Sequence, residues 1–327
     1  MDNLKIFNAK DIDALISKRN GETKLGETIG LFNKIQDLHQ SNAKYILLGI
    51  PEDIGVKANY GIGGTHTAWP AFLSAFLNVQ ANDFLPTEQV ALLGEIMPPE
   101  GVNGSAEGLR IIVEQIDNIV YPVIKYIVSA GKVPIIIGGG HNNSFPNLKG
   151  LSQAVNKAVN VINIDAHADI RPVEEGRHSG NGFSAALNEG FINKYCIFGL
   201  HQNYNNQYTL NQINNHPNIS AVFFDNLLKD NLDIPTAWQD FTQNLYSPCA
   251  LELDLDCISN VLSSAITPTG FSLNEIRKII LQNKIKFSYF HVCEGASKLD
   301  NGRNDAGIGK TISYLISDFI KNQSQLH

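Results

Sequence analysis

Short apolar segments recur along the chain and alternate with segments whose apolar residues follow a helical spacing. Several of the short segments are apolar throughout, which is typical of parallel strands buried on both faces of a sheet. The expected strands are Tyr45–Ile50, Val90–Leu93, Val133–Ile137, Val159–Ile164, Tyr195–Phe198, Ala221–Phe224, Ala250–Leu253 and Phe287–His291.

The clearest expected helix runs from about Ala106 to Ala130, with a kink at Pro122 and an end at Gly131. Residues 1–40 are interpreted as an N-terminal helical extension. The alternation of strands and helices predicts one α/β domain over residues 1–327, with a doubly wound, mainly parallel sheet of about eight strands. Other expected helices are Trp69–Leu77, Pro235–Asn244, Leu273–Gln282 and Thr311–Lys321.

Composition narrows the class of protein. Hydrophobic residues make up 43% and charged residues 17% of the 327 residues, so a large core is expected. The net charge is −7 and no Lys/Arg cluster occurs, which argues against a nucleic-acid partner. Neither a signal peptide nor a stretch near the roughly 18 apolar residues of a membrane span is evident. We expect a cytoplasmic protein that acts on a small molecule and does not bind membranes.

The four cysteines, Cys196, Cys249, Cys257 and Cys293, form no CxxC pair, and most lie in expected strands. Reduced core thiols are therefore expected rather than a disulfide framework. Cys257 and Cys293 flank candidate site residues, so a nucleophilic role is the alternative for these two.

Polar residues follow four of the expected strands at the point where each strand ends. The segments are Gly-Gly-Gly-His-Asn-Asn at 138–143, Asp-Ala-His-Ala-Asp-Ile-Arg at 165–171, Asp-Leu-Asp at 254–256 and Val-Cys-Glu-Gly at 292–295. Sites in open α/β sheets form where loops leave the carboxyl ends of strands. We therefore expect these four loops to meet in one site.

Two imidazoles and four carboxylates in these loops form a candidate ligand set. If the backbone of 165–169 stays extended, its alternate residues point the same way. Converging carboxylates repel one another unless cations intervene, and this oxygen- and nitrogen-rich set suits Mn²⁺. Taken singly, each acid could merely cap a helix or close a turn, but six such residues at three strand ends favour a metal centre. A phosphate cradle is disfavoured because no Lys-Ser/Thr follows the glycines. The six residues are His141, Asp165, His167, Asp169, Asp254 and Asp256.

These motifs resemble the ureohydrolase family of arginases, agmatinases and formimidoylglutamases. The resemblance lies in GGGH at 138–141, DAHAD at 165–169, LDLD at 253–256 with ITPTG at 266–270, and HVCEG at 291–295. Weaker similarity at 50–64 extends it to roughly residues 45–300. The resemblance implies a three-layer arginase/deacetylase-like fold, two Mn²⁺ ions, and commonly a trimer or hexamer.

The resemblance also implies roles by position. His141 and Asp169 would bind one metal, His167 and Asp256 the other, and Asp165 and Asp254 would bridge both. A hydroxide held between the metals would be the nucleophile. Asp169 and Glu294 would be catalytic, with Glu294 also contacting the substrate's cationic nitrogen.

Departures from the arginase pattern bear on the substrate. Ser259, Asn260 and Val261 follow the second Asp pair, where the family usually has Asp-Pro. Arg171 stands where arginases have Asn, as in the Asp-Leu-Arg of formimidoylglutamases, and could bind a carboxylate as a bidentate pair.

In SGNGF (179–183), Ser179 replaces the arginase shuttle histidine. Ser179 and Asn181 are candidate substrate contacts, and His178 is a candidate proton donor whose alternative is an exposed loop residue. Arg177 is interpreted as a solvated loop residue, with anion binding beside Arg171 as the alternative.

The leading hypothesis is hydrolysis of a formimino or amidine substrate, most of all N-formimidoyl-L-glutamate, to formamide and glutamate. The alternative enzyme is a guanidino hydrolase that releases urea. A single-Zn²⁺ deacetylase relative shares the fold, but six ligands argue for two metals. A catalytically silent metal-binding protein is the alternative from another class. Loss of a metal ligand would favour it, but all six ligands are present.

Overall fold

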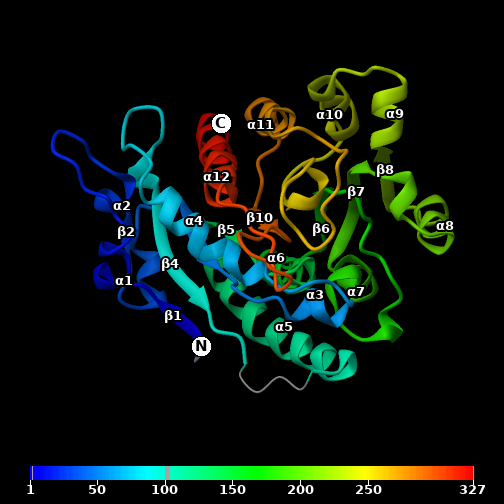
Figure 1. The fold of residues 1–327 in the computed structure, drawn as a ribbon, viewed down its shortest axis with the longest axis horizontal. Helices are drawn as coiled ribbons and strands as arrows, with labels where there is room; N and C mark the ends of the chain where they lie inside the picture. Colours follow the sequence, from blue (N-terminus) through cyan, green and yellow to red (C-terminus); the bar gives the residue numbers. More distant parts are fainter. Residues whose placement is uncertain (2, 100–103, 327) are drawn as a thin grey trace.

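The computed structural model describes residues 1, 3–99 and 104–326. At its centre lies a ten-stranded sheet (Figure 1), ordered β1-β4-β3-β5-β10-β9-β6-β7-β8, with β2 also paired to β4. Among the described residues every strand pair is parallel except β1 with β4. The strands are β1 Leu4–Ile6, β2 Gly30–Leu31, β3 Tyr45–Gly49, β4 Val90–Ile96, β5 Val133–Ile137, β6 Val159–Ile164, β7 Ile192–Leu200, β8 Ile219–Phe223, β9 Cys249–Asp254 and β10 Tyr289–Cys293.

Helices pack on both faces of this sheet (Figure 1). In the described part of the chain, none of them combines the length and apolarity needed to cross a membrane. The helices are α1 Ala9–Asp13, α2 Leu25–Thr28, α3 Ile54–Ala58, α4 Ala68–Phe76, α5 Ala106–Ser129, α6 Ser144–Val155, α7 Gly182–Asn188, α8 Gln207–Asn215, α9 Phe224–Lys229, α10 Ile234–Thr242, α11 Leu273–Gln282 and α12 Ile308–Gln325.

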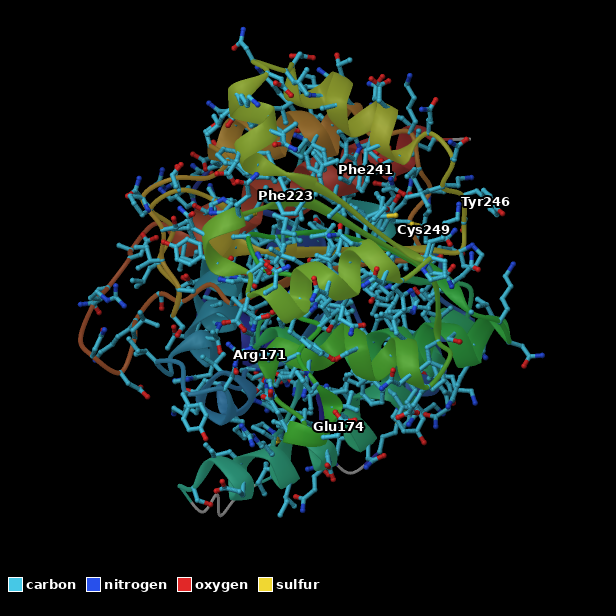
Figure 2. The ribbon with its side chains drawn as sticks, turned by 90° about the vertical axis from the view of Figure 1, so that its right-hand side faces the viewer. Arg171, Glu174, Phe223, Phe241, Tyr246 and Cys249 are labelled. Atoms are coloured by element: carbon cyan, nitrogen blue, oxygen red, sulfur yellow. The ribbon has the colours of Figure 1, made fainter. Side chains whose placement is uncertain are left out.

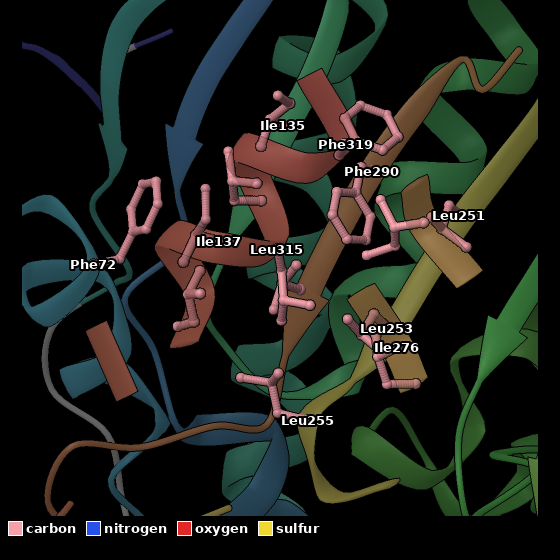
Figure 3. Packing of buried hydrophobic residues seen from close by; sticks show 14 of the residues in the cluster. Phe72, Ile135, Ile137, Leu251, Leu253, Leu255, Ile276, Phe290, Leu315 and Phe319 are labelled. Carbon is pink, nitrogen blue, oxygen red and sulfur yellow. The ribbon is translucent and has the colours of Figure 1, made fainter. Parts of the chain in front are cut away.

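Alternate residues of the central strands enter two separate cores. Ile135 and Ile137 of β5 pack on the face covered by α4, α11 and α12, where Figure 3 shows them near Leu315 and Phe319. Ile136 enters the opposite core, formed with α5, α6 and α7. Because both faces are covered, the strands need no polar alternation, which explains their continuous apolar runs.

The predicted α/β architecture is confirmed, and β5, β6 and α11 have the predicted bounds. The helix α5 continues through Pro122, and Gly131, with φ of 75°, follows its end as expected. The helical extension over residues 1–40 was wrong in part. Short helices occur there, but β1 and β2 join the sheet, which therefore has ten described strands rather than about eight.

Candidate metal centre and active site

The four loops predicted to carry the site follow strands that are neighbours in the sheet. The strands β5, β10, β9 and β6 are adjacent in that order and mutually parallel. Their carboxyl ends therefore lie at one edge, where the loops after them meet. The four loops meet because of the order of the strands in the sheet, and this order cannot be read from the sequence.

Two groups of ligand atoms form at this edge. In the first, His141 Nδ1 lies 3.2 Å from Asp165 Oδ2, 3.0 Å from Asp169 Oδ2 and 3.3 Å from Asp254 Oδ2. In the second, His167 Nδ1 lies 3.5 Å from Asp165 Oδ1 and 3.1 Å from Asp256 Oδ2. Within each group the ligand atoms lie within 4.8 Å of one another, and Asp165 belongs to both groups.

Local turns, rather than an extended backbone, bring the aspartates together. Asp165 Oδ1 accepts a hydrogen bond from the His167 amide at 2.7 Å, and Asp254 Oδ1 accepts one from the Asp256 amide at 2.8 Å. The backbone bends at residues 166–167, and Asp169 has φ of 48°, in the left-handed region. The expected convergence is thus present, but the alternating extended geometry assumed from the sequence was wrong. Each turn is of the kind that Asp side chains stabilise.

The glycine segment before His141 brings the main chain close to the site. Gly139 has φ of 76°, and a Cβ there would lie 2.3 Å from Asn143 Nδ2. The buried Glu52 accepts hydrogen bonds from the Gly140 amide at 2.9 Å and from Asn143 Nδ2 at 2.7 Å. The His141 amide donates to Glu294 Oε1 at 2.8 Å. Only glycine fits this turn. The turn sets the position of the His141 backbone and therefore of its imidazole ring.

The crowded carboxylates oppose one another's ionisation. Burial raises the pKa of Asp254 well above its usual value, and Asp256 and Asp165 raise it further. Burial, with help from Asp256 and Asp169, also raises the pKa of Glu294 to about 8. Burial would lower the pKa of His141, but the adjacent carboxylates raise it well above its usual value. Without cations these groups must hold protons to coexist.

The described residues fit a divalent cation at both groups. His141 Nδ1 and Asp256 Oδ1 are buried and make no hydrogen bond with any described residue. An unpartnered buried polar atom is costly, and one metal ion at each group would satisfy these two atoms. Imidazole and carboxylate donors without a required thiolate suit Mn²⁺.

A cavity of about 370 Å³ opens above the ligands. Its floor is formed by the ligands Asp169, Asp254, Asp256 and His167, and Glu294 lies in the adjoining wall. Arg171 is the only lysine or arginine among the described lining residues. Its guanidinium makes no hydrogen bond or ion pair with any described residue. Figure 2 shows Arg171 on the face turned toward the viewer.

The cavity includes some of the other predicted site residues but not all. Ser179 lines it and accepts a hydrogen bond from Asn59 Nδ2 at 3.3 Å. Asn181 does not line it, because its side chain donates to Gly176 O at 2.7 Å within its own loop. Arg177 is buried and paired with Asp117 at 2.9 Å, so it is neither a solvated loop residue nor part of the cavity wall.

His178 is fully buried and turned into its own loop. Its Nδ1 accepts a hydrogen bond from the Gly180 amide at 3.1 Å, which leaves the proton on Nε2, 3.1 Å from Glu175 Oε2. Burial lowers the pKa of His178 to about 4, with Arg110 and Arg171 acting in the same direction and Glu175 against it. The ring does not line the cavity. Neither alternative drawn from the sequence, a proton donor in the site or an exposed loop histidine, agrees with this position.

Cys257 and Cys293 are free and fully buried. Burial raises the pKa of both thiols well above the usual value. The Cys293 sulfur lies within 4.8 Å of ligand atoms of His141 and Asp254, and its thiol donates to Leu253 O at 3.6 Å. Both thiols therefore remain protonated, as expected for core cysteines rather than nucleophiles.

Supporting residues around the ligands were missed in the sequence. Asn205 Nδ2 donates to Ala166 O at 3.0 Å, and its Oδ1 accepts from the Ala168 amide at 3.2 Å, so it brackets His167. Glu252 lies buried behind His141, bonded to His291. The one available signal was a glutamate inside the otherwise apolar strand Ala250–Leu253.

Comparison with known proteins places the chain among relatives of one family. The model of the arginase family matches residues 43–316. A formimidoylglutamase of Geobacillus sp. (strain WCH70) is 29% identical over 276 residues, which are 81% of this chain and 80% of the relative. The crystal structure of formimidoylglutamase from Bacillus subtilis has a TM-score of 0.77 at 18% identity and covers 95% of each chain. Trypanosoma cruzi formiminoglutamase with Mn²⁺ has a TM-score of 0.73 at 19% identity, covering 94% of this chain and all of that one.

Proposed function

The chain belongs to the arginase family, and from that premise we propose that it hydrolyses N-formimidoyl-L-glutamate to formamide and L-glutamate. The observation that carries the proposal is the cavity itself. Its floor holds converging metal ligands, and its rim holds the guanidinium of Arg171, which pairs with no described residue. The relatives named formimidoylglutamase support this choice of substrate.

We assign two Mn²⁺ ions to the two ligand groups. His141 and Asp169 would hold one ion, His167 and Asp256 the other, and Asp165 and Asp254 would be shared. The membership of Asp165 in both groups supports its bridging role. When bound, the two ions would supply the Lewis acidity that brings the pKa of a water molecule near neutrality.

Side chains of the cavity wall would orient the substrate. The Glu294 carboxylate, held by the His141 amide, would pair with the cationic amidine nitrogen. Arg171 would bind a carboxylate of the glutamate part as a bidentate pair, and Ser179 would donate a further hydrogen bond. These contacts would direct the formimidoyl carbon toward the metal ligands and the two carboxylates toward Arg171.

Asp169 is the residue we assign to proton transfer. Its Oδ2 lies 3.0 Å from His141 Nδ1, which leaves Oδ1 to take the proton of the attacking water. Addition of water to the formimidoyl carbon is followed by cleavage of the bond to the glutamate nitrogen, which receives that proton. Formamide and glutamate leave. We assign no role to His178, because both of its nitrogens are bonded in its own loop.

The test is a comparison of substrates on Mn²⁺-loaded protein. N-formimidoyl-L-glutamate, arginine, agmatine and guanidinobutyrate are each incubated with it, and formamide and urea are quantified. We expect formamide from N-formimidoyl-L-glutamate at the highest kcat/KM. Faster release of urea from a guanidino substrate would identify a guanidino hydrolase instead. Absence of any product from protein with two bound ions would indicate a silent family member.

A further inference from the structure

A buried carboxylate lies behind the metal ligands, on a strand that is otherwise apolar. Glu252 of β9 is fully buried, and it accepts hydrogen bonds from Tyr289 Oη and His291 Nδ1, each at 2.5 Å. Both partners come from β10, where His291 is the residue directly paired with Glu252. A carboxylate in a protein core is costly unless it is hydrogen-bonded and paired, and the two β10 side chains meet that requirement.

The carboxylate oxygen that accepts from His291 also faces His141. Glu252 Oε2 lies 3.6 Å from His141 Nε2, on the ring edge away from the aspartates that approach Nδ1. His141 Nε2 is buried and has no hydrogen-bond partner among the described residues. A ring movement of a few tenths of an ångström would make this contact a hydrogen bond of ordinary length. Glu252 is thus the acceptor available to the Nε2 proton.

A second link joins Glu252 to the turn that carries His141. His291 Nε2 lies 3.3 Å from Gly138 O, at the start of the glycine segment. Gly138, His291, Glu252 and His141 therefore form a closed ring of contacts between the loop and the strands behind it. Such a ring restrains the orientation of the imidazole as well as its proton.

We propose that Glu252 is a positioning residue that holds His141 in the Nε2-protonated form, so that the Nδ1 lone pair faces the first ion. This inference rests on the proposed metal centre. Metal-binding histidines characteristically donate their other N–H to a carboxylate or carbonyl, which fixes the tautomer and strengthens the ligand. Glu252 is the described residue with the position and charge for that role.

The two ligand groups differ in this respect. The His167 side chain is 28% exposed and lies beside Tyr204, with ring centres 6.0 Å apart, whereas His141 is fully enclosed with Glu252 behind it. Loss of the Glu252 charge should therefore weaken the ion at His141 and spare the ion at His167. A general loss of stability would weaken both.

The experiment measures Mn²⁺ binding to metal-free protein, independently of turnover. Wild type, Glu252→Gln and Tyr289→Phe are titrated with Mn²⁺ by calorimetry, and electron paramagnetic resonance reports whether two ions are magnetically coupled. Tyr289→Phe is the matched control, since it removes one hydrogen bond from the same carboxylate but leaves its charge. Wild type and Tyr289→Phe should bind two coupled ions with affinities within about threefold of each other.

Glu252→Gln should bind one ion normally and the second about 10–100-fold more weakly, as is typical when such a carboxylate is lost. At one equivalent it should show the signal of isolated Mn²⁺. If Glu252→Gln does not fold, Glu252→Asp keeps the charge but shortens the side chain, which lengthens the 3.6 Å contact with His141, and it should weaken the same single ion.

Coupled ions at wild-type affinity in either folded variant would overturn the inference, and so would equal weakening of both ions. Failure of the wild type to bind two ions would overturn the proposed function instead, so the two failures can be told apart.

Discussion

Replacing Arg171 by alanine tests how the cavity selects its substrate. The Arg171 amide donates to Gly180 O at 2.9 Å, and its carbonyl accepts from Ser184 Oγ at 2.6 Å, so the main chain is held without the side chain. The guanidinium itself makes no hydrogen bond or ion pair with any described residue. Its removal should therefore leave the fold and the metal ligands intact while deleting the cationic group of the rim.

The size of the effect follows from the exposure of the side chain. A hydrogen bond to a charged partner contributes about 1.5–3 kcal/mol. Because Arg171 is exposed, solvent screening should hold the contribution near the lower end of that range. A loss of about 1.5 kcal/mol corresponds to roughly a tenfold fall in kcat/KM. Most of it should appear as a higher KM, since the carboxylate is bound equally in the ground and transition states.

The assay is steady-state release of formamide by wild type, Arg171→Ala and Arg171→Lys. An N-alkylformamidine without carboxylates serves as the control substrate, on which the variants should match the wild type. Arg171→Lys keeps the charge but loses the bidentate geometry, so its KM should fall between the other two. Equal losses on both substrates, or no loss with N-formimidoyl-L-glutamate, would refute the assignment of Arg171 to carboxylate binding.

Three further expectations concern the metal centre and the thiols. Asp165→Ala should lose both ions and all turnover, because Asp165 belongs to both ligand groups; two ions retained by elemental analysis after desalting would contradict its bridging role. Chelation should lower the unfolding temperature measured by scanning fluorimetry, since an ion at 100 times its Kd stabilises the native state by about 2.7 kcal/mol; an unchanged temperature would argue against structural binding. Cys257→Ala and Cys293→Ala should keep kcat within about tenfold of wild type, or about 1.4 kcal/mol in barrier. Inactivation of the wild type by an alkylating agent, if substrate prevents it, would instead indicate a nucleophilic cysteine.

The ligands could be predicted because their signals are local. Each lies within a few residues of a strand end, in a short motif such as Asp165–Asp169, and parallel strands place such ends at one edge. The supporting residues carry no comparable signal. Glu252 meets His291 only through the register of β9 and β10, which lie 39 residues apart along the chain at this pair. Tertiary pairing of this kind cannot be derived from one sequence.

The N-terminal strands show a different limit. The strand β1 has three residues, and its pattern is too short to indicate a period. Its conformation comes from the antiparallel partner, with Leu4 paired to Ile96 and Ile6 to Gly94. Likewise β2 has two residues and pairs with β4. Strands this short become extended because they pair with a neighbouring strand, and not because of the intrinsic β-propensity of their residues.

Charge balance connects the buried ligands with the choice of substrate. The ligand set contains four aspartates, and their crowding without cations shows in the raised pKa of Asp254. Two divalent ions would balance four aspartate charges in full. Glu294 would then remain as the unmatched anion of the wall and Arg171 as the unmatched cation of the rim. A substrate with a cationic amidine at one end and carboxylates at the other complements that arrangement, whereas a substrate with a cationic tail would bring like charge to Arg171. Arg171, two residues after the ligand motif, should therefore distinguish this chain from family members that act on guanidino compounds. The metal ligands themselves should not.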